Sequence, residues 1–432
     1  MSKHNSEPLL AGWPSWSRRA LLGSFAAASV YVAMAGAAVA QDVQFWHYQT
    51  FGNQRALQQM VSGFEKEAGV KVRETSKPAS ELYSAAIAAA AIGRGPDVMQ
   101  VFTRNVPAMV TMMKAVPLDG DAKAGAWLGN YLASFLAMGT YEGKVYGAPH
   151  SLGTPLLYYN KDLFRKAGLD ADKPPRTWAD VVSYAKQIQA KTGKSGVTLV
   201  HDSLDYGANT MLMGNQSRML SDDGKRVAFD DARGIEAMQL WQDMVVKDKI
   251  HPTGEANAMR SAFESGELGM RTDTSALLGR FVRATKGRFE LGVAEFPTWG
   301  DRPRSVPNSG SVLMVFAPEG PRRDNALKLV QYLSRPEISN EWARVSGYMP
   351  VARDPLADPK MAAFYKENPD YLPALKQMKD TVPVVVWPAE QAGEISVRLK
   401  NMVDALWLDK APAPQIVHET AAGINKLLAD GK

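Results

Sequence analysis

The spacing of apolar and polar positions changes repeatedly between residues 42 and 102. Residues 42–48 and 69–74 alternate as strands do, and 97–102 form an apolar run typical of a buried strand. Residues 53–66 and 81–92 carry a helical period. The order strand, helix, strand, helix, strand predicts a doubly wound α/β lobe with parallel strands.

Polar and aromatic residues follow the first and third of these expected strands. Trp46, His47 and Tyr48 lie at the end of the first strand, and Thr103 directly follows the third. Ligands of doubly wound sheets bind beyond the carboxyl ends of the strands. We therefore expect these four residues to line a ligand site.

A different pattern covers residues 141–164. Residues 141–146 predict two short polar strands with Gly143 at the turn, and an apolar strand over 155–159 precedes a helix that begins near Asn160. This succession predicts that the chain crosses here from one lobe to another. The Gly/Pro/Ser segment between them, with Ser151, is expected to form a wall of the cleft between the lobes.

Strand and helix patterns continue to the end of the chain and predict a second α/β lobe. The expected strands cover 197–200, 267–271, 291–297 and 311–318, and the expected helices cover 160–167, 178–192, 230–248, 258–265 and 323–333. Asn53 and Thr177 are expected to cap helices. Further crossings are expected near Met270 and near 312–316.

These patterns predict two doubly wound α/β lobes joined by a hinge of several crossings. Lobe 1 is expected to contain residues 41–150 and about 272–311, and lobe 2 residues 151–271 and about 312–432. A chain of 432 residues is too long for one core, which agrees with this division. The formal net charge of +5 is small and spread along the chain, so no nucleic-acid surface is expected.

Residues 1–40 have the features of an export signal. Arg18 and Arg19 precede an apolar run, and Ala38-Val39-Ala40 fits the small residues that signal peptidase requires. We expect a twin-arginine signal peptide cleaved after about Ala40, with the Sec route and a membrane anchor as alternatives. The chain has no cysteine, which excludes disulfides and a lipoprotein anchor, so we expect a periplasmic protein.

Several short motifs occur in order along the chain after residue 40. They are Phe45-Trp-His, Gly95-Pro-Asp-Val-Met-Gln-Val, Tyr141-x-Gly-Lys-x-Tyr-Gly-x-Pro, Thr154-Pro-Leu-Leu-Tyr-Tyr-Asn-Lys-Asp, Pro174-Pro-Arg-Thr-Trp, Gly266-Glu-Leu-Gly-Met, Gly310-Ser-Val-Leu-Met-Val and Trp342-x-x-x-x-Gly-Tyr-Met-Pro. Their succession resembles the family 1 extracellular solute-binding proteins of ABC importers. The resemblance implies a periplasmic binding protein-like fold of type II and a monomer that closes around a small solute and delivers it to membrane permease subunits.

Within that family the chain is most similar to binding proteins for sn-glycerol 3-phosphate and related phosphodiesters. Tyr348 and Ser309 match residues of the cleft in those proteins. The glycerol-binding glutamate falls on Thr103, however, and the phosphate-binding arginine falls near Ser396, with Arg398 two positions away. The resemblance therefore favours a sugar, oligosaccharide or polyol as the ligand, with sn-glycerol 3-phosphate or a glycerophosphodiester as the alternative.

A sugar-binding site needs aromatic faces to stack on the ring and planar polar groups to bind its hydroxyls. The residues expected to bind the solute are Trp46, His47, Tyr48, Thr103, Ser151, Asp202, Tyr206, Arg271, Asp273, Ser309, Tyr348 and Arg398. Trp299 and Trp387 are further candidate stacking residues, whereas Trp178 and Trp241 lie on amphipathic helices and are expected in the core.

Three of these assignments have an alternative reading. Arg271 and Asp273 form either a salt bridge at the hinge or a contact to the ligand, and His47 is either a ligand donor or a hydrogen-bonded structural histidine. If Arg271 or Arg398 lines the cleft, an anionic ligand becomes plausible, because arginine binds phosphate and carboxylate through two hydrogen bonds.

No catalytic, nucleotide-binding or zinc motif occurs in the sequence. We therefore expect no enzyme activity, no metal and no cofactor. An exported enzyme acting on glycans or phosphodiesters is the rival hypothesis, and a ligand-binding partner of a chemoreceptor is a third.

Overall fold

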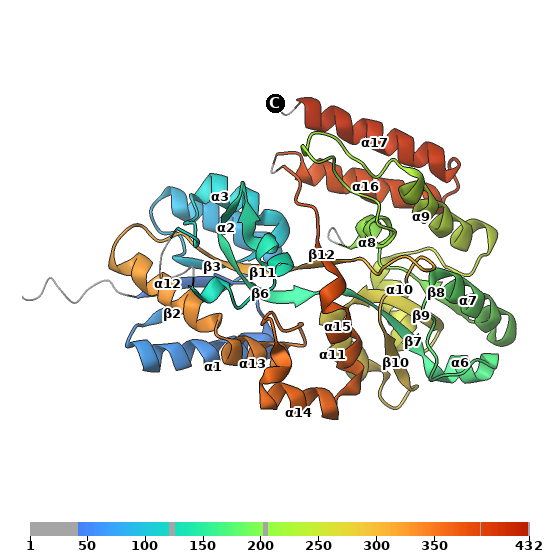
Figure 1. The fold of residues 1–432 in the computed structure, drawn as a ribbon, viewed down its shortest axis with the longest axis horizontal. Helices are drawn as coiled ribbons and strands as arrows, with labels where there is room; N and C mark the ends of the chain where they lie inside the picture. The colour runs from blue at the N-terminus through green and yellow to red at the C-terminus, as the bar shows by residue number, and fades with distance from the viewer. Residues whose placement is uncertain (1–41, 121–125, 202–205, 389, 431–432) are drawn as a thin grey trace, which may run out of the picture. The chain divides into compact units, whose positions relative to one another are not determined.

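The computed structural model describes residues 42–430, apart from 121–125, 202–205 and 389 (Figure 1). The predicted signal peptide and Asp202 lie outside the described residues. The described residues form a six-stranded sheet and a four-stranded sheet, each flanked by helices, and a two-stranded hairpin, which confirms the predicted α/β fold class.

The first sheet has the strand order β12-β11-β3-β1-β2, and β6 also pairs with β11. Its strands are β1 (Val43–His47), β2 (Val72–Ser76), β3 (Val98–Phe102), β6 (Gly147–Gly153), β11 (Val306–Val315) and β12 (Thr381–Pro383). β1 is parallel to both β2 and β3, as predicted, whereas β11 is antiparallel to β3 and β6. The sheet as a whole is therefore mixed.

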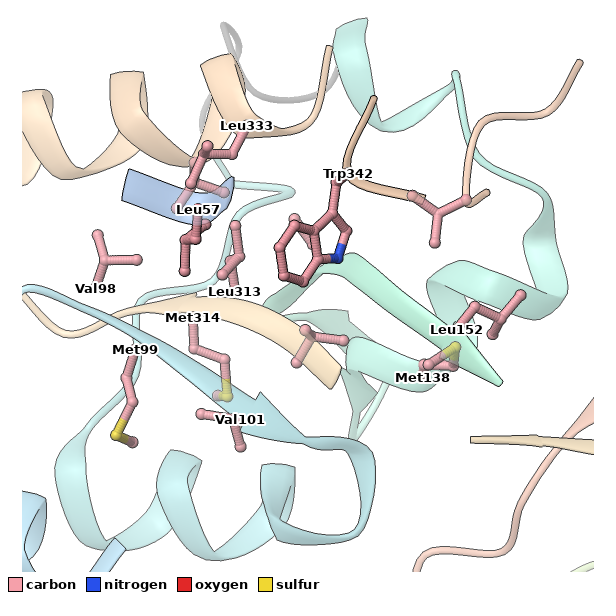
Figure 2. Packing of buried hydrophobic residues seen from close by; sticks show 14 of the residues in the cluster. Leu57, Val98, Met99, Val101, Met138, Leu152, Leu313, Met314, Leu333 and Trp342 are labelled. Atoms are coloured by element: carbon pink, nitrogen blue, oxygen red, sulfur yellow. The ribbon is translucent and has the colours of Figure 1, made fainter. Parts of the chain in front are cut away.

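Helices cover both faces of the first sheet. They are α1 (Phe51–Ala68), α2 (Ala79–Ala91), α3 (Val106–Met113), α12 (Pro321–Leu333) and α13 (Pro336–Ser346). Figure 2 shows Leu57, Leu313 and Trp342 on one side of the strands, and Met99 and Met314 on the other. Side chains from both faces of β3 and β11 are buried, which explains the continuous apolar run of 97–102.

The second sheet has the order β10-β7-β9-β8. Its strands are β7 (Pro155–Asn160), β8 (Ser195–Thr198), β9 (Leu268–Thr274) and β10 (Leu291–Ala294). β7 is antiparallel to β9 and β10, and β8 is parallel to β9. Trp178 and Trp241 are buried in the core beside this sheet, as predicted, and Trp299 and Trp387 are buried in the same core.

The helices beside the second sheet include the four expected over 160–167, 178–192, 230–248 and 258–265, together with others that had no expected range. They are α6 (Lys161–Ala167), α7 (Trp178–Thr192), α8 (Gly207–Gly214), α9 (Ala232–Gln242), which continues as a π-helix (Asp243–Lys247), α10 (Ala256–Glu264), α11 (Leu278–Thr285), α16 (Ala392–Trp407) and α17 (Ala413–Asp430). Thr177 and Asp180 cap α7 reciprocally through side chain and backbone. Thr50, and not Asn53, is the N-cap residue of α1.

Short elements complete the described chain. They are α5 (Ala133–Leu136), β4 (Thr140–Tyr141), β5 (Lys144–Val145), α14 (Pro359–Glu367) and α15 (Leu372–Lys376). β4 and β5 form the hairpin expected over 141–146, and Gly143 adopts a positive φ of 77° at its turn.

The chain passes from the first sheet to the second at Thr154, between β6 and β7. The buried side chain of Gln377 holds this crossing: its Nε2 donates to Thr154 Oγ1 (3.0 Å) and to the Pro155 carbonyl (2.7 Å). Its Oε1 accepts from the Phe296 amide (2.9 Å), in the segment between β10 and β11. One glutamine therefore joins two crossings to the segment that precedes β12.

Sheet membership differs from the expected lobe ranges in several segments, of which β10, α12 and α13 are examples. β10 pairs with β7 in the second sheet, although 272–311 was expected in lobe 1, and α12 and α13 pack with α1, although 312–432 was expected in lobe 2. Met270 lies within β9, paired with Tyr159 and Val197, and is not a crossing. The return crossing lies instead between β10 and β11, and the exact lobe ranges stay a prediction.

Candidate functional site

The ends of β1 and β3 bring two aromatic rings together. Tyr48 stacks on Phe102 with a centroid distance of 4.3 Å and an interplanar angle of 19°. Thr103, which follows β3, is buried, and its hydroxyl lies 3.4 Å from the Gly310 carbonyl of β11. The carboxyl end of β3 therefore meets the middle of β11, and the stacking of Tyr48 on Phe102 brings the end of β1 to the same place.

A second aromatic stack lies beside the first. His150 stacks on Trp342 (5.0 Å, 15°), and Trp342 stacks on Tyr348 (6.4 Å, 21°). Burial raises the pKa of Tyr48 well above its ordinary value, and the nearby Tyr348 phenol raises it further. Burial also raises the pKa of Tyr348. Both phenols are neutral at physiological pH and can donate hydrogen bonds.

A buried hydrogen-bond network fixes the Trp342 ring. Ser151 Oγ accepts from Trp342 Nε1 (3.0 Å), and Gln100 Nε2 donates to Ser311 Oγ (2.8 Å) and lies 3.5 Å from Ser151 Oγ. Gln49 Nε2 in turn donates to Gln100 Oε1 (3.1 Å). Ser151 is fully buried, and its hydroxyl orients the Trp342 ring.

Residues from the second sheet approach the same region at Gly153, the last residue of β6. A methyl group at position 153 would lie 2.8 Å from Thr274 Oγ1, 2.9 Å from the Tyr206 hydroxyl and 3.6 Å from the Ser309 carbonyl oxygen. Only glycine allows these groups to approach so closely. We call Tyr48, Thr103, Gly153, Tyr206, Thr274, Ser309 and Tyr348 the aromatic–hydroxyl cluster.

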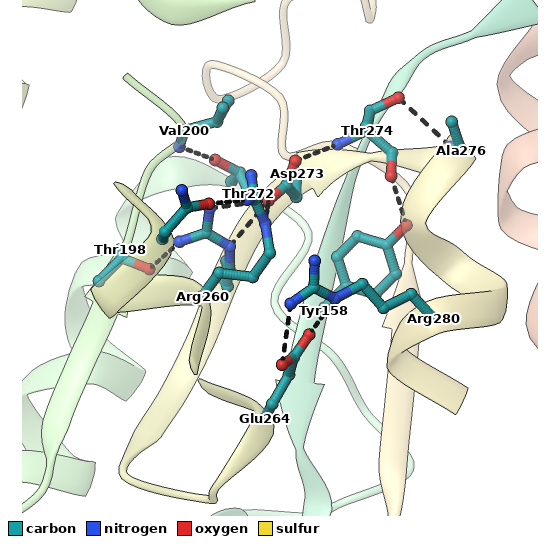
Figure 3. Close-up of polar contacts among 12 residues, drawn as sticks. Tyr158, Thr198, Val200, Arg260, Glu264, Thr272, Asp273, Thr274, Ala276 and Arg280 are labelled. Carbon is teal, nitrogen blue, oxygen red and sulfur yellow. Dashed lines mark hydrogen bonds and ion pairs between the residues drawn. The ribbon is translucent and has the colours of Figure 1, made fainter. Parts of the chain in front are cut away.

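Asp273 directly precedes Thr274 in β9 (Figure 3). Arg271 lies two residues earlier in the same strand. Arg271 and Asp273 are 1% and 2% exposed. Arg271 Nε and Nη2 donate to Asp273 Oδ2 (2.9 and 2.7 Å), and Arg271 Nη1 donates to Thr198 Oγ1 (3.3 Å). Arg260 Nε also donates to Asp273 Oδ2 (3.3 Å), and Asp273 Oδ1 accepts from the Thr274 amide (2.9 Å). This geometry is that of the structural salt bridge, the first of the two readings.

The remaining predicted residues lie outside the cluster. His47 is buried, with Nε2 3.3 Å from Glu74 Oε2 and Nδ1 accepting from the Gln49 amide, which fits the structural reading. Trp46 is half-buried beneath Lys77 Nζ, 5.9 Å from the ring centroid. Arg398 is 40% exposed on α16 and donates to Glu394 at 2.7 Å.

Several residues of this region were not among the predicted site residues. Phe102 belongs to a continuous apolar strand, so no sequence signal separates it from the core. His150 is buried, and its Nε2 has no hydrogen-bond partner among the described residues. Burial lowers the pKa of His150 to about 3, with a smaller contribution from the nearby His47. His150 is therefore neutral, and it supports the Trp342 ring without carrying charge.

The family model for bacterial extracellular solute-binding proteins matches residues 48–339. The chain belongs to this family. The prediction from the ordered motifs is thus confirmed, and this solute-binding protein is a component of an ABC importer. Within the described residues, no helix is both long and apolar enough to span a membrane.

Two curated relatives cover most of the solute-binding protein. It is 29% identical over 376 residues to the sn-glycerol-3-phosphate-binding periplasmic protein UgpB of Agrobacterium fabrum, covering 83% of this chain and 85% of the relative. It is 26% identical over 425 residues to UgpB of Pectobacterium atrosepticum, covering 93% and 95%.

Two solved structures share the fold of the solute-binding protein. The cyclic alpha-maltosyl-1,6-maltose binding protein of Arthrobacter globiformis has a TM-score of 0.82 at 23% identity, covering 90% of this chain and 99% of that one. UgpB of Mycobacterium tuberculosis, in complex with glycerophosphocholine, has a TM-score of 0.77 at 19% identity, with the same coverage.

Proposed function

We propose that this solute-binding protein captures a small polyhydroxylated solute, such as a sugar, oligosaccharide or polyol, at the aromatic–hydroxyl cluster. The cluster combines flat rings, which can stack on the C–H face of a sugar, with neutral hydroxyls that donate and accept hydrogen bonds. The structural neighbour that binds a cyclic maltosyl-maltose supports a carbohydrate ligand for this fold.

One observation carries this proposal: neutral groups from both sheets converge at Gly153. Tyr206 and Thr274 come from the second sheet and its connections, whereas Ser309 and Gly153 belong to strands of the first. A solute held by both sides favours the state in which the sheets are close together. The proposed mechanism is therefore hinge closure, followed by delivery of the solute to the permease.

A second candidate is an anionic glycerol derivative, because one described arginine lies beside the cluster. The Arg104 guanidinium lies over the Phe102 ring, with Cζ 4.4 Å from the ring centroid. The Tyr48 ring also stacks on Phe102. An arginine in this position could bind a phosphate. The relatives named as sn-glycerol-3-phosphate-binding proteins and the neighbour that holds glycerophosphocholine favour this candidate.

The compartment and the partners belong to the same proposal. The curated relatives are named as periplasmic, which supports a periplasmic location after cleavage near Ala40. We propose a monomer that docks onto the permease subunits of the importer. We also propose that it has no enzyme activity, because the chain belongs to a family of binding proteins.

Isothermal titration calorimetry tests the proposal with maltose, maltotetraose, glycerol, sn-glycerol 3-phosphate and glycerophosphocholine. Binding of a neutral saccharide or polyol supports the first candidate. Binding of the two phosphates alone, lost in Arg104→Gln, supports the second. If the protein binds none of these compounds and binds an amino acid or a metal ion instead, both candidate functions are refuted.

A further inference from the structure

Asn308 has a buried side-chain amide without a partner among the described residues. It lies on β11 and is 0% exposed. Neither its Nδ2 nor its Oδ1 has a hydrogen-bond partner in the part of the chain that the structure describes. The backbone of Asn308 is held, because its carbonyl accepts from the Val384 amide (3.2 Å) opposite Pro383 of β12. The unpaired groups are therefore those of the side chain alone.

An unpaired buried amide is unusual. Most buried polar side-chain atoms in native proteins have at least one hydrogen-bond partner. A buried polar atom without a partner has lost its hydrogen bonds to water and gained none within the protein. An apolar residue of similar size would avoid this loss at position 308. A polar residue kept at such a position is often paired in another functional state, with a bound ligand or an ordered water.

The position of Asn308 places it next to the aromatic–hydroxyl cluster. It directly precedes Ser309, whose carbonyl faces Gly153, and lies two residues before Gly310, whose carbonyl is the partner of Thr103. Strand alternation puts Asn308 on the same face as Val306, which belongs to the core beside the second sheet. β11 also packs against α8, which begins directly after Tyr206.

We propose that Asn308 is a specificity-determining residue that binds two adjacent hydroxyls of the solute. Nδ2 would donate to one hydroxyl, and Oδ1 would accept from the other. A vicinal diol offers this combination, in a sugar ring or at the end of a glycerol unit, whereas a phosphate dianion offers acceptors only and would leave Oδ1 unpaired. This inference rests on the proposed function and narrows its ligand to compounds with a vicinal diol.

The test compares Asn308→Leu with Asn340→Leu. Asn340 is also buried, on α13, but its Nδ2 donates to Asp358 Oδ2 (3.3 Å), and only its Oδ1 has no partner among the described residues. For the ligand that binds wild type in the calorimetric panel, Asn308→Leu should raise Kd by about tenfold or more, with the thermal midpoint of the ligand-free protein unchanged or raised. Asn340→Leu should lower the midpoint and leave Kd unchanged.

Each outcome bears on the inference. An unchanged Kd in Asn308→Leu would overturn it, because the amide would then lie outside the site. A midpoint that falls as far as in Asn340→Leu would also overturn it, because the amide would already be satisfied without the solute. If wild type binds nothing in the panel but binds an amino acid or a metal ion, the proposed function fails, and the thermal midpoint still decides whether the Asn308 amide is unpaired in the free protein.

Discussion

Removal of Asp273 should destabilise the protein far more than removal of Glu264, a nearby carboxylate whose arginine partner is exposed. Asp273 accepts from the 1% exposed Arg271 at 2.7 and 2.9 Å and from Arg260 at 3.3 Å. Asp273→Ala leaves a fully buried guanidinium without a counter-charge. Glu264, in contrast, pairs with Arg280, which is 48% exposed and can be solvated by water.

The magnitudes follow from burial. Breaking a buried ion pair by removing one partner costs about 3–5 kcal/mol, whereas an exposed pair is worth about 0–1 kcal/mol. Arg271→Met should cost less than Asp273→Ala, because Arg260 stays beside Asp273. The double variant Arg271→Met/Asp273→Leu should recover much of the loss, because apolar residues can replace a buried pair without leaving a charge.

Urea unfolding of the four variants, followed by tryptophan fluorescence, measures these differences as shifts of the midpoint. The expected order of stability is Glu264→Gln, then Arg271→Met, then Asp273→Ala, with the double variant above Asp273→Ala. The reasoning fails if Asp273→Ala is as stable as Glu264→Gln. It fails equally if the double variant is less stable than Asp273→Ala, because an uncompensated charge would then not explain the loss.

Three further predictions concern the site and pH. Gly153→Ala should weaken solute binding by about tenfold or more in calorimetry, because its methyl group would meet Thr274 and Tyr206 below 3.0 Å; unchanged affinity would remove this point from the site. Tyr348→Ala should abolish binding while far-ultraviolet circular dichroism stays that of the wild type, and retained binding would contradict the placement of the ring. Burial lowers the pKa of both His150 and His251 to about 3, below that of an unfolded histidine, so their contribution to stability is complete above pH ~6.5 and is lost as the pH falls toward 3. The midpoint of urea unfolding should therefore fall less steeply with decreasing pH in His150→Gln than in wild type. Parallel plots of midpoint against pH for the two proteins would contradict the prediction.

The local elements could be read from the sequence because their signals are local. The alternation in β1 and β2, the apolar run of β3 and the Thr177 cap of α7 each lie within a few residues, and the structure has all of them. The helix start at Asn53 was wrong because Thr50, in an extended conformation, already serves as the N-cap. Two candidate helix starts three residues apart cannot be separated by periodicity alone.

The crossings between the sheets were harder to predict because strand pairing is not local. β10 joins β7 across a sequence separation of more than a hundred residues, and its short apolar pattern fits either sheet. The predicted crossing at Met270 failed because β9 is buried on both faces within one sheet. Apolar patterning indicates burial of a strand without indicating which partner buries it.

The ion pairs of Arg271 and Arg398 are indicated by the spacing of oppositely charged residues in the sequence. Asp273 lies two positions from Arg271 on the same face of a strand, and Glu394 lies four positions from Arg398 on a helix, and both spacings favour ion pairs. The approach of Tyr206 to Gly153 is different, because it depends on two segments that only tertiary folding brings together. Sequence alone could name Tyr206 but not its neighbour.

Gln377 has a mechanical consequence. Its amide ties the β6–β7 crossing at Thr154 and Pro155 to the β10–β11 crossing at Phe296, and it lies on the segment that leads into β12. Segments joined at one buried point cannot shift independently without breaking hydrogen bonds. A relative movement of the two sheets that keeps these hydrogen bonds cannot separate the two crossings from each other or from Gln377.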